Sequence, residues 1–210
     1  MKPREWKQMV LETAKQGYAE KLFAGTSGNV SVYDPERGFM AITPSGVPYQ
    51  TMKTEDIVWM TPEGETAESA REPSSEWRAH AAIYQTRPDI RAVVHTHSPY
   101  ATGFAVCHRP IPLILIEMIP FVGGDIPVAE FAVPGTKDLG LAALAALSGR
   151  TSCLLANHGV LAVGEDSRKA YLAAVYTEDA AKICAYAEAV GEIQVIPEET
   201  RNSVRRKLGL

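Results

Sequence analysis

Cysteine, long apolar runs and net charge are all scarce in this 210-residue chain, and each scarcity excludes a class of protein. The three cysteines, Cys107, Cys153 and Cys184, stand far apart in apolar contexts, so we expect buried free thiols and no disulfide framework. No stretch reaches the roughly 20 apolar residues that a membrane-spanning helix needs, and the first residues lack the apolar core of a signal peptide. We therefore expect a cytoplasmic protein that does not bind membranes.

The net charge of −4 is too small to indicate a charged partner, and it argues against nucleic-acid binding, which needs a clustered positive surface. The basic residues near the end, Arg201, Arg205, Arg206 and Lys207, are expected on a solvated helix face. Hydrophobic residues make up 46% of the chain and charged residues 22%, which is ordinary for a globular protein. The length and composition predict one α/β domain over residues 1–210.

Hydrophobic spacing alternates between helical and strand periods along the chain. The pattern predicts helices over 6–18, 77–86, 99–107, 136–147 and 166–190, and strands over 29–33, 39–43, 57–60, 91–97, 111–116, 152–156 and 160–163. Short connections make the first three strands antiparallel neighbours. Ser74 and Ser75 are expected to cap the second helix, and proline after Arg87 to end it.

The most informative motif is His95-Thr96-His97, at the end of an apolar run. Because alternate side chains of a β-strand point to the same face, this spacing delivers two imidazoles to one place. A divalent metal ion is one explanation for the pair. The alternative is that each ring only bonds to carbonyl groups or water, and further ligands elsewhere in the chain would favour the metal.

Glu76 and His158 supply such ligands, because both stand at junctions between expected elements. Three imidazoles and a carboxylate suit one divalent ion per subunit, with Zn2+ preferred and Mn2+ or Co2+ as alternatives. His80, one helical turn after Glu76, could join the site or simply pack on its helix face. His108 is expected to be solvated.

Three polar loops offer hydroxyl groups and free backbone amides for an anion. They are residues 26–29, residues 43–46 and the Ser74-Ser75 pair, which directly precedes Glu76. Each could be merely a turn or a cap, but together they suit a phosphate group beside the metal ligands. None is a Walker loop or a dinucleotide fingerprint, so nucleotide binding is not supported.

Five motifs occur in the order and spacing of the class II aldolase/adducin family, and the chain resembles its L-fuculose-1-phosphate aldolase branch. They are Gly25-Thr26-Ser27-Gly28-Asn29-Val30-Ser31, Ile42-Thr43-Pro44-Ser45-Gly46, Pro73-Ser74-Ser75-Glu76, Val94-His95-Thr96-His97 and Asn157-His158-Gly159. The resemblance implies a three-layer α/β/α fold with a central, largely antiparallel sheet. It also implies a homotetramer with active sites at subunit interfaces.

By motif match, His95, His97 and His158 would bind the metal, and Glu76 would be a displaceable ligand and the general acid/base. A second set would surround the substrate phosphate: Gly28, Asn29, Ser45, Gly46, Ser74 and Ser75. The implied reaction is reversible cleavage of a ketose 1-phosphate to dihydroxyacetone phosphate and a small aldehyde. The substrate would be L-fuculose 1-phosphate or a related deoxy- or methylthio-ribulose 1-phosphate.

One departure concerns a tyrosine that fuculose aldolases carry in the run matching residues 111–118. Glu117 is the nearest ionisable replacement, and it would act either as a proton donor to a neighbouring subunit or as an interface ion pair. Related members suggest other functions: a pentulose-phosphate 4-epimerase, a sugar-acid phosphate decarboxylase, or a non-catalytic interaction module like the adducin head.

Overall fold

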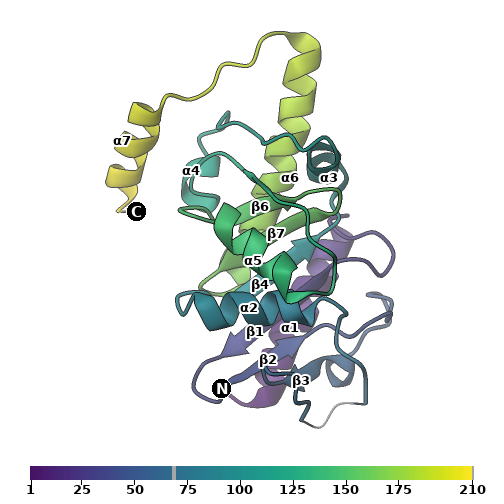
Figure 1. Ribbon diagram of the computed structural model, residues 1–210. Coiled ribbons are helices and arrows are strands. Elements are labelled where there is room, and N and C mark those ends of the chain that lie inside the picture. The colour runs from purple at the N-terminus through teal and green to yellow at the C-terminus, as the bar shows by residue number, and fades with distance from the viewer. Residues whose placement is uncertain (68–69, 210) are drawn as a thin grey trace.

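Seven strands form one mixed sheet in the computed structural model, which describes residues 1–67 and 70–209. The strand order is β3-β2-β1-β4-β7-β6-β5. The strands are β1 (Asn29–Asp34), β2 (Phe39–Ile42), β3 (Val58–Met60), β4 (Ala92–Thr96), β5 (Val128–Ala129), β6 (Ser152–Leu155) and β7 (Gly159–Gly164). All neighbours are antiparallel except β5 and β6. The largely antiparallel sheet expected for the family is thereby confirmed (Figure 1).

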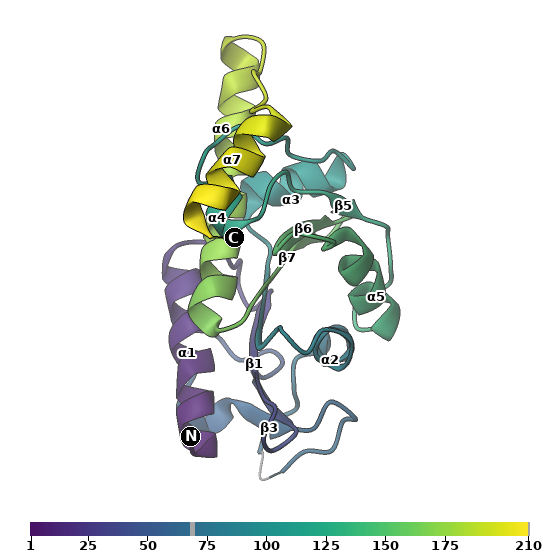
Figure 2. The same cartoon turned by 90° about the vertical axis from the view of Figure 1, so that its left-hand side faces the viewer.

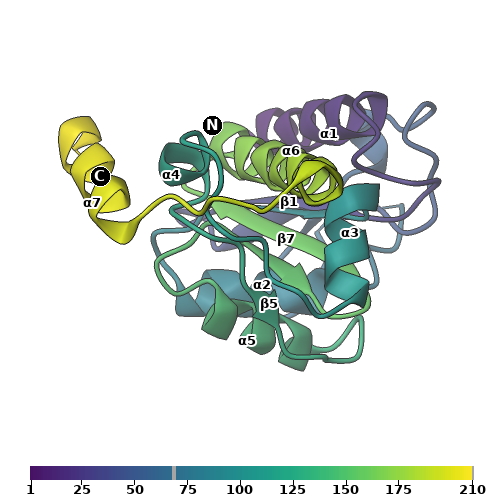
Figure 3. The same ribbon diagram turned by 90° about the horizontal axis from the view of Figure 1, so that it is seen from above.

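Helices cover both faces of this sheet. They are α1 (Pro3–Ala19), α2 (Trp77–Thr86), α3 (Pro99–Val106), α4 (Met118–Phe121), α5 (Lys137–Ala146), α6 (Ser167–Val190) and α7 (Glu198–Leu208), with a short 3₁₀ helix at Thr54–Asp56. Figure 2 shows α1 and α6 on one face of the sheet and α2 and α5 on the other. The view from above separates the same three layers and sets α7 apart from them (Figure 3). The α/β/α architecture is therefore confirmed.

The strands are buried on both faces, as a three-layer arrangement requires. Neighbouring residues of β4 show this, because Val94 packs in the core beneath α1 and α6 while Val93 packs in the core beneath α2 and α5. A third apolar cluster joins α3, α4 and α6 to Leu154 on β6 and Val160 on β7. A central strand with one apolar face to each helix layer explains the continuous Val-rich run of β4.

The register around β4 places the chemically informative residues at one end of the sheet. His95 pairs with Asn29 on β1 and with Leu161 on β7, and Thr96 pairs with Val160. The turn between β6 and β7, which contains His158, therefore lies at the same end as His95 and His97. Glu76 is the residue immediately before α2.

The expected strand over residues 111–116 is wrong. Only Ile111 makes a bridge, to Ile126, and the rest of the run is irregular up to α4. Pro110 and Pro112 explain the failure, since proline has no N–H to donate to a sheet. The sequence patterns also missed α4 and the two-residue strand β5.

Two smaller expectations also need correction. Cys107 is exposed, whereas Cys153 and Cys184 are buried free thiols as expected. The N-cap of α2 is Glu76, and neither Ser74 nor Ser75 occupies that position.

Within residues 1–67 and 70–209, no helix has both the length and the apolar composition that crossing a membrane requires.

We predict that Gly140→Ala destabilises the protein, because α5 crosses α2 at this glycine. A Cβ atom at Gly140 would lie 2.6 Å from the Ala79 carbonyl oxygen and 2.9 Å from the Ala82 Cβ atom. Overpacking of this kind costs about 1–3 kcal/mol of unfolding free energy. Gly103→Ala in α3 is the matched control, since a Cβ atom at that position would have no neighbour within 4 Å. Urea denaturation should show a loss for Gly140→Ala alone; equal stability of the two variants would contradict the packing argument.

Candidate metal centre and active site

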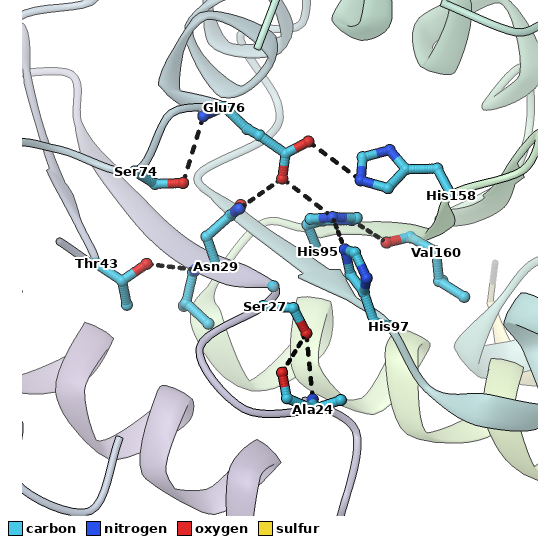
Figure 4. A network of polar contacts seen from close by, with 12 residues as sticks. Ala24, Ser27, Asn29, Thr43, Ser74, Glu76, His95, His97, His158 and Val160 are labelled. Atoms are coloured by element: carbon cyan, nitrogen blue, oxygen red, sulfur yellow. Dashed lines mark hydrogen bonds and ion pairs between the residues drawn. The ribbon is translucent and has the colours of Figure 1, made fainter. Parts of the chain in front are cut away.

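Three imidazole rings converge at the end of β4 (Figure 4). The ring centroids of His95 and His97 are 4.8 Å apart, those of His95 and His158 are 4.6 Å apart, and those of His97 and His158 are 5.0 Å apart. One ligand atom from each ring lies within 4.8 Å of those of the other two. The structure thus brings together the three histidines that the sequence indicated as metal ligands.

Local geometry explains how residues so far apart in the chain meet. His95 and His97 share a face because they are two positions apart along an extended segment. His158 comes from the tight turn that leads into β7, and Gly159 lets that strand approach β4 closely. A Cβ atom at Gly159 would lie 2.3 Å from the Thr96 carbonyl oxygen and 3.3 Å from the His95 ring.

The tautomer of His95 is set by the backbone of β7. Its Nδ1 atom lies 2.8 Å from the Val160 carbonyl oxygen, which can only accept a hydrogen bond. Nδ1 therefore carries a proton and donates to Val160, which leaves Nε2 as the ring nitrogen directed at the other residues of the cluster. That Nε2 atom lies 2.9 Å from His97 Nε2 and faces the centre of the cluster. A carbonyl group that orients one ring nitrogen is the usual support for a histidine that binds metal through the other.

Glu76 completes the cluster from the start of α2. Its Oε2 atom lies 3.1 Å from His95 Nε2, and its Oε1 atom lies 3.3 Å from His158 Nε2. The carboxylate is buried, and the Asn29 amide donates a 2.8 Å hydrogen bond to Oε2. Burial by itself raises the pKa of Glu76, but the nearby His95 and His158 rings and the Asn29 bond outweigh it and hold that pKa below its ordinary value. The carboxylate is therefore ionised at neutral pH.

A divalent cation fits these four residues. Burial lowers the pKa of His97 to about 4, with the His95 and His158 rings acting in the same direction, so His97 is neutral and able to bind metal near pH 7. Glu76 Oε1 is buried without a hydrogen-bond partner among the described residues. Converging imidazole nitrogens beside an unsatisfied carboxylate oxygen form the donor set that Zn2+ and similar ions take.

The three polar loops lie side by side next to Glu76. Pro44 and Pro73 form a bridge, and the Ser74 N–H donates to the Thr43 carbonyl oxygen at 3.0 Å. Thr43 in turn accepts a hydrogen bond from Val30 N–H through its hydroxyl group. Gly28 and Gly46 have positive φ angles of 77° and 69°, which glycine adopts without strain.

The six residues expected to hold a phosphate differ in exposure. Ser45, Gly46 and Ser75 are exposed, whereas Ser74 and Asn29 are buried. The Asn29 amide is directed at Glu76, a contact that the sequence did not indicate. A small anion could thus reach the exposed residues of these loops from solvent, while Asn29 links the loops to the carboxylate.

Tyr49 supports the first loop and has no signature in the sequence. This buried residue donates its hydroxyl group to the Gly28 and Ser27 carbonyl oxygens, at 2.8 Å and 3.0 Å. Its ring stacks on Phe23, with centroids 5.0 Å apart. A Cβ atom at Gly28 would lie 2.5 Å from the Phe23 ring, so the loop packs closely onto these aromatic rings.

His80 lies behind the cluster and not in it. Its Nδ1 atom is 2.6 Å from the Ser31 hydroxyl oxygen, which is also 2.6 Å from the Tyr84 hydroxyl oxygen. The ring is 1% exposed, and burial, reinforced by His95, lowers its pKa to about 3. His80 is therefore a neutral, buried residue of α2 that is bonded to β1 through Ser31. His108, expected to be solvated, is exposed but bonds to Asn157.

Glu117 belongs to a helix, α4, that is bonded at the opposite end of β6 from His158. It is exposed at the N-cap of α4, and Phe121 at the other end of that helix accepts a hydrogen bond from Thr151. Thr151 precedes β6, whereas His158 follows it. A catalytic role for Glu117 would therefore require the site of a neighbouring subunit.

The chain is similar to known proteins along most of its length. The family profile described as "Class II Aldolase and Adducin N-terminal domain" matches residues 8–185. A 5-deoxy-D-ribulose 1-phosphate aldolase of Bacillus thuringiensis serovar kurstaki is 35% identical over 201 residues, which are 96% of this chain and 94% of that protein. A 5-methylthioribulose-1-phosphate/5-deoxyribulose-1-phosphate aldolase of Rhodospirillum rubrum is 38% identical over 94% of this chain and 88% of that protein. A solved L-fuculose 1-phosphate aldolase matches with a TM-score of 0.92 and 41% identity, covering 98% of this chain and 97% of that one.

We predict that His80 makes the stability of the metal-free protein depend on pH. The unfolded chain protonates this histidine near its ordinary pKa of 6.5, whereas the folded state resists protonation down to about 3. The unfolding free energy should therefore fall as pH decreases through this window, with His80 contributing about 1.4 kcal/mol per pH unit. Urea denaturation at pH 7, 6 and 5 should show a shallower dependence in His80→Gln. Parallel curves for the two proteins would refute the assignment.

Proposed function

Because this chain belongs to the class II aldolase and adducin family, we propose that it is a metal-dependent aldolase that reversibly cleaves a ketose 1-phosphate. The products would be dihydroxyacetone phosphate and a small aldehyde. The observation that carries the proposal is the convergence of His95, His97 and His158 on the Glu76 carboxylate, beside loops that suit a phosphate.

For the sugar we favour a 5-deoxy- or 5-methylthio-ribulose 1-phosphate. Relatives with these activities align with nearly the whole chain. The tyrosine of the fuculose branch is also missing from residues 111–118. L-Fuculose 1-phosphate is the second candidate, because the solved fuculose-phosphate aldolase resembles this chain closely in structure and sequence.

In this proposal the three histidines hold one divalent ion, with Zn2+ preferred and Mn2+ or Co2+ as alternatives. Such an ion, when bound, stabilises the negative charge that develops on the substrate oxygens when the carbon–carbon bond breaks. The protein supplies three converging imidazoles, and the Val160 carbonyl orients the His95 ring through Nδ1. No Schiff-base lysine is needed.

Glu76 is the proposed acid/base. In condensation its carboxylate removes a proton from the carbon of dihydroxyacetone phosphate that forms the new bond, and in cleavage it returns that proton. The role requires an ionised carboxylate next to the ligands, which the lowered pKa of Glu76 provides. Asn29 keeps the carboxylate oriented through its 2.8 Å hydrogen bond to Oε2.

The loops around Glu76 are proposed to hold the substrate phosphate. Gly28, Gly46, Ser45 and Ser75 offer backbone amides or hydroxyl groups, with buried Ser74 and Asn29 behind them. A phosphate group anchored in this way holds the reacting carbon at a fixed position relative to Glu76, and the phosphate itself takes no part in bond cleavage. A homotetramer is part of the proposal, since a neighbour's Glu117 would then take the proton from the hydroxyl group of the aldehyde half in cleavage and return it to the aldehyde oxygen in condensation.

Product analysis tests the reaction. Purified protein of measured metal content should condense dihydroxyacetone phosphate with members of a panel that includes acetaldehyde, lactaldehyde and methylthioacetaldehyde, and a chelator should abolish the reaction until Zn2+ is restored. Release of carbon dioxide from a sugar-acid phosphate would indicate a decarboxylase. Epimerisation of a pentulose phosphate without fragments would indicate an epimerase, and protein that binds no divalent metal would fit an interaction module.

We predict that Glu76→Gln abolishes proton exchange while sparing phosphate binding. Exchange of the carbon-bound proton of dihydroxyacetone phosphate with deuterated solvent, followed by NMR, should fall at least about 100-fold, the usual contribution of a general base. The variant should still bind inorganic phosphate with affinity near that of the wild type. Ser75→Ala is the matched comparison, because it should weaken phosphate binding and retain exchange at saturating substrate. Undiminished exchange in Glu76→Gln would remove Glu76 from the role of base.

A further inference from the structure

His158 is held in the cluster differently from His95. The second ring nitrogen of His95 donates to the Val160 carbonyl oxygen at 2.8 Å. The corresponding nitrogen of His158, Nδ1, is buried and has no hydrogen-bond partner within the part of the chain that the structure describes. Metal-binding histidines usually rely on such a partner to orient the ring. The orientation of His158 must therefore come from the backbone turn that carries it.

That turn has a conformation that few residues adopt. Asn157, directly before His158, has a φ angle of 55°. Across residues 1–67 and 70–209 only Lys21 and His108 are other non-glycine residues with positive φ. Asparagine tolerates this region better than most residues, but the conformation still needs support from its surroundings. The exposed position of Asn157 means that core packing does not provide it.

The support comes from the C-terminal corner of α3. The Asn157 N–H donates to the Ala105 carbonyl oxygen at 3.1 Å, and the His108 Nε2–H donates to Asn157 Oδ1 at 2.5 Å. His108 is itself left-handed, with φ of 51°, and its N–H bonds back to Ala105 at 3.2 Å. The Ala105 carbonyl oxygen thus accepts hydrogen bonds from the N–H groups of both left-handed residues, Asn157 and His108. The side chains of these two residues are hydrogen-bonded to each other as well.

The structure assigns His108 as a positioning residue for His158, acting through Asn157. The inference rests on the proposed function to the extent that the three histidines bind a divalent metal. His108 acts on His158 indirectly. Its hydrogen bond to Asn157 fixes the turn that carries the His158 ring, whose Nδ1 atom has no hydrogen-bond partner of its own among the described residues. Loss of this contact should weaken metal binding while leaving the core, which contains neither His108 nor Asn157, unchanged.

Metal affinity of His108→Gly is the test. Glycine removes the side chain and keeps the left-handed backbone accessible, so the variant isolates the contact with Asn157. The dissociation constant for Zn2+, measured by chelator competition, should rise about tenfold, the lower end of the effect of removing a supporting residue. The absorption spectrum of the Co2+ form should change in parallel. Cys107→Ser, an exposed neighbour on the same corner, is the control and should match the wild type.

Asn157→Gly removes the same hydrogen bond from the other side and guards against a His108 variant that does not fold. It should also weaken Zn2+ binding, and adding His108→Gly to it should cause no further loss, because the acceptor is already absent. Unchanged affinity in Asn157→Gly or in a folded His108→Gly, or losses that multiply in the double variant, would overturn the inference. Thermal unfolding of the metal-free variants checks folding. A wild-type protein that binds no Zn2+ would instead refute the proposed metal site itself.

Discussion

The pairing of β4 with β1 on one side and β7 on the other is the constraint on which the site depends. This pairing sets Asn29 opposite His95 and Val160 opposite Thr96. A shift of one residue would send alternate side chains to the opposite face of the sheet. Because both faces are buried under helices, such a shift would place apolar residues of β4 against the wrong layer. Packing of the two cores therefore also fixes where the imidazoles meet.

Burial and charge act against each other within the cluster. Desolvation lowers the pKa of His97 and of His158, and by itself it would raise the pKa of Glu76. The imidazoles and the Asn29 amide reverse that effect for Glu76. The result is one ionised carboxylate beside three converging imidazoles, an arrangement that favours a divalent cation because it brings a negative charge and nitrogen ligands to one place.

Support for the ligands is uneven, and this unevenness follows from their positions in the fold. His95 lies within a central strand, so a neighbouring strand supplies a carbonyl group for its ring. His158 lies in a turn, where no strand neighbour is available, and α3 packs against that turn instead. Glu76 precedes α2, which packs closely against α5 at Gly140, and both helices cover the same face of the sheet (Figure 2). The position of each of these side chains is therefore set by the strand or helix that packs next to it.

The sequence by itself indicated the three histidines and Glu76, which the fold brings together, and it predicted most of the secondary structure. Three features can be read from neighbouring residues alone, without knowledge of the fold: the spacing of His95 and His97, the glycine after His158 and the apolar periodicity of the strands. Local pattern failed at residues 111–116, where β-prone side chains are interrupted by prolines, and at α4 and β5, which are too short to show a period. Only the tertiary structure decided that Asn29 bonds to Glu76, that Tyr49 holds the Gly28 loop and that His108 reaches Asn157. Those contacts join residues distant in the chain, and their partners are chosen by strand register and helix packing, which no local spacing encodes.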